Sequence, residues 1–81
     1  MAVDWARFGE DAKAFRTAKT KDRFPGYIGI REAAKQIGIS PATYQRIEAG
    51  ESDMRAETFL AACFWMDQNP GQYFIKEREN G

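Results

Sequence analysis

Two short helical segments separated by only three residues constrain the fold of this chain more than any other feature. The spacing of apolar residues predicts one of these helices over residues 30–37. Gly38 ends this helix because glycine readily adopts a left-handed backbone. Ser40 is a good N-cap for the other helix of the pair, and Pro41 suits its first position. Gly50 terminates this helix. A connection this short prevents antiparallel packing, so the two helices must cross steeply.

The steep crossing restricts the residue types that these two helices can carry. Ala34 lies where the helices meet, so only a small side chain fits there, and Gly38 occupies the turn. Ile39 flanks the turn, while two apolar residues further along hold the second helix against the core. The residues assigned to this scaffold are Ala34, Gly38, Ile39, Tyr44, Ile47 and Gly50.

The remaining segments also predict helices, and none shows the sustained period-two alternation of a strand. The first helix begins after Asp4, an acceptable N-cap, and its apolar pattern fades after Ala18 into a loop over residues 20–29. The fourth helix is expected from residue 54 or 55 to residue 66. A short fifth helix follows, with Asn69 as N-cap, Pro70 in the first turn, Gln72 at the capping-box position, and Tyr73, Phe74 and Ile75 within it.

These segments predict an all-α fold, a compact bundle of about five short helices with the steeply crossed pair at its centre. Eighty-one residues suffice for one domain and no more, so a single domain is predicted over residues 1–81. The hydrophobic content of 43% is enough for one core, and the tail at residues 77–81 is expected to fray.

The composition excludes much of the usual chemistry of enzyme sites. Histidine is absent, which removes the commonest general base and metal ligand. Cys63 is the single cysteine and lies in an apolar run, so it is predicted to be a buried, reduced thiol. We therefore expect neither catalytic activity nor a metal or cofactor site.

The apolar residues do not form a membrane-spanning pattern. No apolar run approaches the roughly 18 residues that a membrane span requires. The N-terminal segment from Met1 to Arg7 lacks the pattern of a signal peptide. A cytoplasmic protein without a membrane partner is therefore expected.

The net charge of zero conceals a concentration of positive charge in the middle of the chain. Residues 13–46 hold eight basic residues against two acidic ones, a net charge of +6. Residues 1–12 carry −2, and residues 47–81 carry −4. A one-sided basic stretch is typical of a phosphate-binding face, although a merely solvated charged surface is the alternative.

The segment from Arg31 to Gly50 contains an Ala-x-x-x-Gly-x-Ser core and an Arg-Ile-Glu-x-Gly ending. This segment resembles the lambda-repressor-like (XRE-type) helix-turn-helix family. Residues 59–66 and the later Asn-Pro-x-x-Tyr-Phe motif at residues 69–74 are similar to the closing helices of that family. The resemblance covers residues 28–75 and implies a helix-turn-helix at residues 30–50. It also implies that the helix from Ser40 to Ala49 enters the major groove of DNA.

The resemblance implies that one edge of this helix reads base pairs. Arg46 can offer paired donors to guanine O6 and N7 or bind a phosphate, and Gln45 can match adenine. Ala42 and Thr43 can touch a thymine methyl group, whereas Pro41 contributes only shape. Solvated side chains without a base partner are the alternative for Arg46 and Gln45.

Other residues are predicted to contact the DNA backbone. Ser40 and the N–H groups behind it suit a phosphate. Relatives usually carry glutamine at the position of Ile30, so Arg31 is the substitute phosphate ligand here. The loop at residues 51–53 is acidic where relatives are often basic, which leaves Arg55 as the nearest donor. Lys19, Lys21 and Arg23 form either an arm along the DNA or an ordinary charged loop.

Glu48 is assigned to structure and not to readout. In the family that the segment resembles, the matching acid pairs with a basic residue of the first helix. Arg16 is the first candidate for that partner, and Arg23 is the second.

A homodimer is expected, because one recognition helix reads few base pairs and each specific contact contributes roughly 1–3 kcal/mol of discrimination. The resemblance implies a pseudo-palindromic site with half-sites about one helical turn apart. The aromatic residues Trp65, Tyr73 and Phe74 either form a C-terminal dimer contact or complete the core.

The leading prediction is a sequence-specific regulator of transcription that binds double-stranded DNA, similar to phage repressors or restriction controllers. It is expected to stand alone, since no ligand-binding or protease domain is attached. One alternative is an antitoxin that represses its own promoter and binds a toxin. Another is a protein-interaction module that kept the fold, lost DNA binding and binds a regulatory protein. The acidic C-terminal third and the zero net charge leave this second alternative open.

Overall fold

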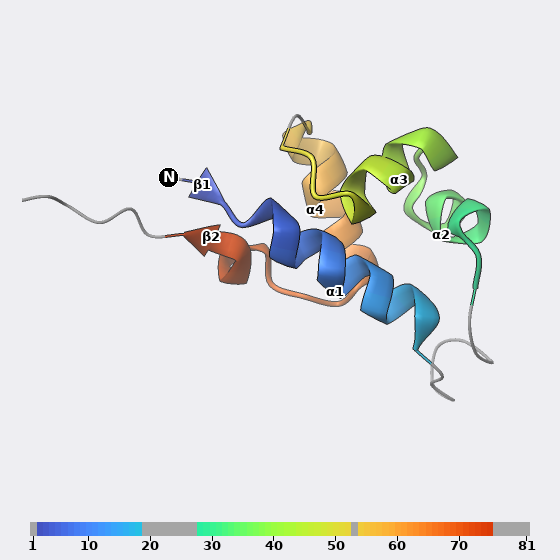
Figure 1. The fold of residues 1–81 in the computed structure, drawn as a ribbon, viewed down its shortest axis with the longest axis horizontal. Coiled ribbons are helices and arrows are strands. Elements are labelled where there is room, and N and C mark those ends of the chain that lie inside the picture. The colour runs from blue at the N-terminus through green and yellow to red at the C-terminus, as the bar shows by residue number, and fades with distance from the viewer. Residues whose placement is uncertain (1, 19–27, 53, 76–81) are drawn as a thin grey trace, which may run out of the picture.

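The computed structural model describes residues 2–18, 28–52 and 54–75 of the chain. Within these residues there are four α-helices, one short 3₁₀ helix and one pair of two-residue strands. Figure 1 shows them in chain order: β1 (Ala2–Val3), α1 (Trp5–Thr17), α2 (Ile30–Ile37), α3 (Pro41–Glu48), α4 (Ala56–Trp65), η1 (Pro70–Tyr73) and β2 (Phe74–Ile75).

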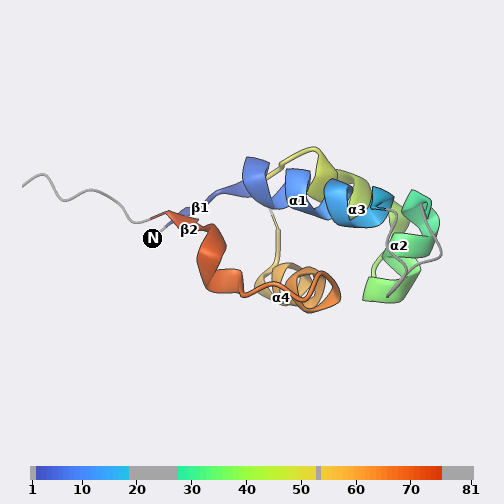
Figure 2. The same cartoon turned by 90° about the horizontal axis from the view of Figure 1, so that it is seen from below.

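The helices form two layers (Figure 2). Helices α1 and α3 lie side by side in one layer, and α4 lies in the other. Helix α2 closes one end of the molecule, and the antiparallel pair of β1 and β2 lies at the opposite end. This arrangement leaves the outer side of α3 uncovered by any other described element.

Aromatic side chains fill the space between the layers. Phe8, Phe59 and Tyr73 pack edge to face, with ring centroids 4.9 Å apart for Phe8 and Phe59 and 5.4 Å apart for Phe8 and Tyr73. Trp65 of α4 packs against the rings of Phe15 and Tyr44, at 4.8 and 5.8 Å respectively. The core therefore ties α4 to both helices of the other layer.

Gly9 allows α1 to cross α3 at close range. It is buried, and a Cβ atom added there would fall on the carbonyl oxygen of Ile47 and close to that of Glu48. A residue without a side chain is therefore required at this position.

The first turn of α1 is capped by the Asp4 carboxylate, which accepts from the backbone N–H of Arg7 at 3.1 Å.

The helices predicted at residues 5–18, 30–37, 40–49 and 54–66 are all present, and their ends differ from the predicted ones by at most two residues. The expected all-α class is correct for the body of the fold. The loop predicted over residues 20–29 falls mostly outside the described residues, as does the tail at residues 77–81.

The predicted fifth α-helix is wrong. Residues 70–73 form a four-residue 3₁₀ helix, and Phe74 and Ile75 leave it to pair with Val3 and Ala2. The side-chain Oδ1 of Asn69 accepts from the backbone N–H of Gly71, but the side-chain amide of Gln72 donates to Oε1 of Gln68 and forms no capping box. Backbone pairing with β1, together with the bond from the Asp4 N–H to the Tyr73 carbonyl oxygen at 2.7 Å, holds this segment extended.

Candidate nucleic-acid interface

The turn between α2 and α3 has the geometry that the sequence predicts. Gly38 adopts a φ of +95°, and its N–H donates to the carbonyl oxygen of Ala34 at 2.8 Å. Ile39 donates to the same carbonyl at 3.0 Å. Ala34 is 1% exposed, so the small side chain required at the crossing is enclosed by the two helices.

Ser40 caps the N-terminus of α3. Its hydroxyl accepts from the backbone N–H of Thr43 at 3.1 Å and donates to the Thr43 hydroxyl at 2.9 Å. The Ser40 side chain is therefore held within the first turn of α3, and the Thr43 hydroxyl is held with it. Pro41 occupies the first helical position, where a missing N–H costs nothing.

Helix α3 has one buried face and one exposed edge. Tyr44 and Ile47 are fully buried. Pro41, Ala42, Gln45 and Arg46 are exposed, and Thr43 is half-buried at the same edge. Four residues predicted to read bases thus lie along the exposed edge: Ala42, Thr43, Gln45 and Arg46.

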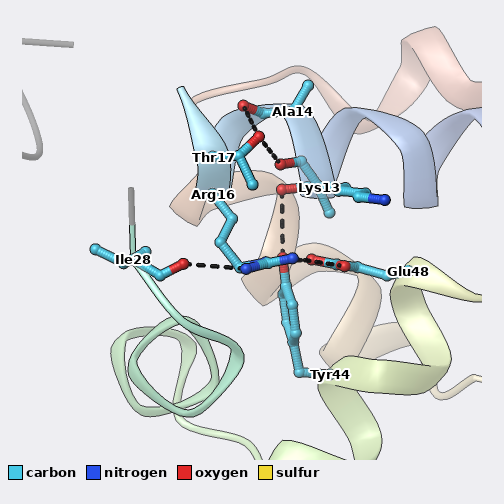
Figure 3. Close-up of polar contacts among 8 residues, drawn as sticks. Lys13, Ala14, Arg16, Thr17, Ile28, Tyr44 and Glu48 are labelled. Carbon is cyan, nitrogen blue, oxygen red and sulfur yellow. Dashed lines mark hydrogen bonds and ion pairs between the residues drawn. The ribbon is translucent and has the colours of Figure 1, made fainter. Parts of the chain in front are cut away.

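A buried ion pair anchors α3 to α1 (Figure 3). The Arg16 guanidinium donates to both carboxylate oxygens of Glu48, at 2.6 and 3.1 Å, and to the carbonyl oxygen of Ile28 at 3.0 Å. Arg16 is 5% exposed. The structure thus joins Glu48 to the first of the two partners considered for it. Because its charge is buried and paired, Arg16 adds nothing to a phosphate-binding surface.

Tyr44 makes a second polar link between α3 and α1. Its hydroxyl donates to the carbonyl oxygen of Ala12 at 3.2 Å (Figure 3). Burial raises the pKa of Tyr44 well above its ordinary value, and the Glu48 carboxylate raises it further. Tyr44 therefore stays protonated and keeps its donor role over the physiological range.

Arg46 forms an ion pair with Glu51, a contact that was not predicted from the sequence. Its Nε donates to the Glu51 carboxylate at 2.8 Å, across the turn that follows α3. Both residues line a hollow of about 260 Å³ together with Thr43, Met54, Arg55 and Thr58. The structure thus brings two of the predicted DNA-binding arginines, Arg46 and Arg55, to one site.

A second basic position lies on α2. Arg31 and Lys35 are exposed and one helical turn apart, and they line a hollow of about 360 Å³ beside Pro41 at the start of α3. Lys35 received no role from the sequence, although its spacing of four residues from Arg31 places both on one face. Three other predicted backbone contacts, Lys19, Lys21 and Arg23, lie outside the described residues.

Two further findings concern the described residues alone. None of their helices has the length and apolar content needed to cross a membrane. Their cysteine, aspartate and glutamate side chains form no group of three or more that could hold a metal ion.

Helices α2 and α3, the left-handed glycine between them and the exposed edge of α3 form a helix-turn-helix, a motif that many DNA-binding proteins use. A family model described as Helix-turn-helix, of the XRE or lambda-repressor-like type, matches residues 30–63. Residues 30–63 are therefore similar to that family, whose members are DNA-binding regulators. No curated protein and no solved structure shows a significant match to the chain.

Proposed function

We propose that this chain is a sequence-specific regulator of transcription that binds double-stranded DNA as a single domain over residues 1–81. One observation carries the proposal: a rigidly anchored α3 exposes an uninterrupted edge of residues suited to base readout. The Arg16–Glu48 pair and the Tyr44 hydrogen bond fix the other face of α3 to α1. A helix held in this way can enter the major groove without rearrangement.

Each side chain on the exposed edge has a matching base chemistry. Arg46 is proposed to donate two N–H groups to guanine O6 and N7. Gln45 is proposed to pair with the N6 and N7 atoms of adenine, and Ala42 and Thr43 to contact thymine methyl groups. Pro41 supplies shape alone, so three polar side chains carry most of the specificity.

The proposed backbone contacts flank this edge. Arg31 lies on one side at the α2 hollow, and Arg55 lies on the other at the hollow beside Arg46. Ser40 is proposed to approach a phosphate at the start of α3. Lys19, Lys21 and Arg23 are proposed to add sequence-independent affinity from the preceding segment.

We further propose a homodimer on a pseudo-palindromic operator. The exposed apolar side chains Leu60 and Phe64 of α4 and Phe74 and Ile75 of β2 support a contact between copies. Tyr73 is fully buried and Trp65 packs against Phe15 and Tyr44, so these two aromatic residues complete the core. Of the three aromatic residues first considered for the dimer contact, only Phe74 is exposed.

A second candidate function is binding of a partner protein, either a toxin neutralised by this chain or a regulatory protein. Phe64 favours this candidate, because it is 82% exposed on a helix without charged residues from Thr58 to Trp65. The two candidates differ in whether α3 or α4 carries the activity. An antitoxin that represses its own promoter would use both surfaces.

The test of the proposal begins with retention on generic duplex DNA at low salt, followed by selection of bound sequences from a random duplex pool. Arg46→Ala is expected to weaken binding by about 1–3 kcal/mol and to relax the selected motif at one base pair. Lys13→Ala, which removes an exposed charge from α1, serves as the control and should leave the motif unchanged. A chain that is not retained at low salt would favour the protein-binding candidate. An unchanged motif for Arg46→Ala would contradict its role in readout.

A further inference from the structure

Glu51 is held over the last turn of α3 by its backbone as well as by its side chain. Gly50 adopts a φ of +76°, and the N–H of Glu51 donates to the carbonyl oxygen of Arg46 at 3.2 Å. The Glu51 carboxylate then accepts from Nε of that same Arg46 at 2.8 Å. The end of α3 therefore holds the backbone of Glu51 close to that of Arg46, so that the two side chains can meet.

Fold stability does not account for this ion pair. The side chains of Arg46 and Glu51 are 47% and 49% exposed, and exposed pairs of this kind contribute little to the free energy of folding. The carboxylate also lies beside the edge of α3 that is proposed to meet DNA, where it repels phosphates. A residue that adds little stability and opposes DNA binding calls for another explanation.

The chemistry of base readout supplies that explanation. A guanidinium that recognises guanine must place two of its N–H groups in the plane of the base. An arginine that is unrestrained before binding loses the conformational entropy of its side chain when it adopts this geometry. A hydrogen bond from Nε to a fixed carboxylate orients the plane of the guanidinium before DNA arrives, and it disfavours other arrangements of the arginine on the DNA.

We propose that Glu51 is a positioning residue that directs Arg46 toward a single base pair, at the expense of general affinity for DNA. This inference rests on the proposed function and extends it to an acidic residue outside the recognition helix. Glu51 exchanges general affinity, through repulsion of phosphates, for discrimination at the base pair that Arg46 reads. Glu51, which follows α3, is then a determinant of specificity.

Two substitutions separate the charge of Glu51 from its hydrogen bond. Glu51→Gln removes the negative charge, but its amide oxygen can still accept from Arg46 Nε. Glu51→Ala removes both. Dissociation constants are measured for the full chain on its selected duplex and on the same duplex with the Arg46 base pair replaced. Glu57→Gln and Glu57→Ala are matched controls, since Glu57 is an exposed acid in the first turn of α4 that does not line the hollow around Arg46.

Glu51→Gln is expected to tighten binding to both duplexes by about threefold and to keep their affinity ratio. Glu51→Ala is expected to lower that ratio by about fivefold, which is part of the discrimination that a bidentate contact gives. In an Arg46→Ala background Glu51→Ala should leave the ratio unchanged, and the Glu57 variants should leave it unchanged in the wild-type background.

The outcomes distinguish this inference from the function on which it rests. A wild-type chain that selects no duplex sequence would overturn the proposed function and the role of Glu51 with it. A wild-type chain that selects a motif, with the same affinity ratio after Glu51→Ala, would overturn only the role of Glu51. A loss of ratio that persists in the Arg46→Ala background would also overturn it, because Glu51 would then act without Arg46.

Discussion

At the scale of single residues, two arginine–glutamate pairs differ in burial: one is buried and the other is about half exposed. Arg16 and Glu48 have side chains that are 6% and 12% exposed, whereas those of Arg46 and Glu51 are about half exposed. A buried charge that loses its partner keeps its desolvation cost, but an exposed one is solvated by water. The same chemical pair therefore has a structural role in one place and can serve recognition in the other.

This difference predicts how the two pairs respond to loss of a carboxylate. Glu48→Gln leaves the buried Arg16 charge unpaired and is expected to lower the free energy of unfolding by about 3–5 kcal/mol. Glu51→Gln is expected to change it by less than about 1 kcal/mol. Urea unfolding of the two variants measures both values.

The double variant Arg16→Met with Glu48→Leu controls for damage to packing. It replaces the pair with apolar side chains of similar volume and should recover much of the stability that Glu48→Gln loses. Equal losses for Glu48→Gln and Glu51→Gln would contradict the assignment of the buried pair as the anchor of α3.

The titration of Cys63 makes the stability of the fold depend on pH in the alkaline range. Burial raises the pKa of its thiol from 9.0 to about 11, so above pH 9 the unfolded chain releases a proton that the native chain retains. The resulting stability is present below pH 9 and is lost as the pH rises toward 11, at up to about 1.4 kcal/mol per pH unit. Unfolding in urea at about pH 8 and about pH 10 compares the wild type with Cys63→Ala. The stability difference between the two proteins should shrink at the higher pH, and a constant difference would show that the thiol does not titrate as described.

Some contacts of single residues could be predicted from the sequence, whereas others could not. The partner of Glu48 could be predicted because the resemblance to a family implied one. Gly9 could not, because nothing nearby in the sequence reveals that the backbone of α3 passes over it. The contact between Arg46 and Glu51 was likewise missed, since their separation of five residues falls outside the usual spacing of helix pairs and depends on the turn at Gly50.

At the scale of elements, the accuracy of prediction follows the range of the interactions that form each element. Helices α2 and α3 were predicted closely because Gly38, Ser40 and Pro41 are local signals that act within one turn. The strand pair and the 3₁₀ helix were missed because they form when the two ends of the described chain meet. Two-residue strands are also too short to show a period of two.

Helix α2 carries the next prediction. Arg31 and Lys35 share one exposed face beside the start of α3, so each is expected to neutralise one DNA phosphate. Arg31→Ala and Lys35→Ala should each weaken binding to all sequences alike and flatten the plot of log affinity against log salt by about one unit. The double variant should flatten it by about two units.

A selection experiment checks that these residues contact the backbone and not the bases. The motif selected by each α2 variant should match that of the wild type. A loss confined to particular sequences, or a salt dependence equal to that of the wild type, would exclude Arg31 and Lys35 as phosphate ligands.

At the scale of the whole molecule, the two layers separate the two proposed surfaces. The recognition edge belongs to α3, whereas the exposed apolar side chains Leu60 and Phe64 lie on α4 in the other layer (Figure 2). The buried face of α4, with Phe59, Ala62 and Cys63, points to the core, so Leu60 and Phe64 face outward. A protein contact on α4 would therefore leave α3 accessible to DNA.

Phe64 allows the dimer to be tested without damage to the core. Because it is 82% exposed, Phe64→Ser should change the free energy of unfolding by less than about 0.5 kcal/mol. If α4 joins two copies, this variant should dissociate to monomers at concentrations where the wild type is dimeric, as measured by sedimentation equilibrium. Its binding to a two-half-site duplex should then weaken, while its binding to a single half-site stays at the wild-type level.

Phe74→Ser separates an α4 interface from one built on β2, since Phe74 is 45% exposed and lies on that strand. Dissociation by Phe74→Ser and not by Phe64→Ser would move the dimer contact to the strand pair and leave α4 as the surface for a different protein. A wild-type chain that is monomeric in solution and binds one copy per selected duplex would exclude the homodimer. The few polar readers on α3 would then act without a second half-site, and discrimination at single base pairs, including the one that Glu51 is proposed to sharpen, would carry all of the specificity.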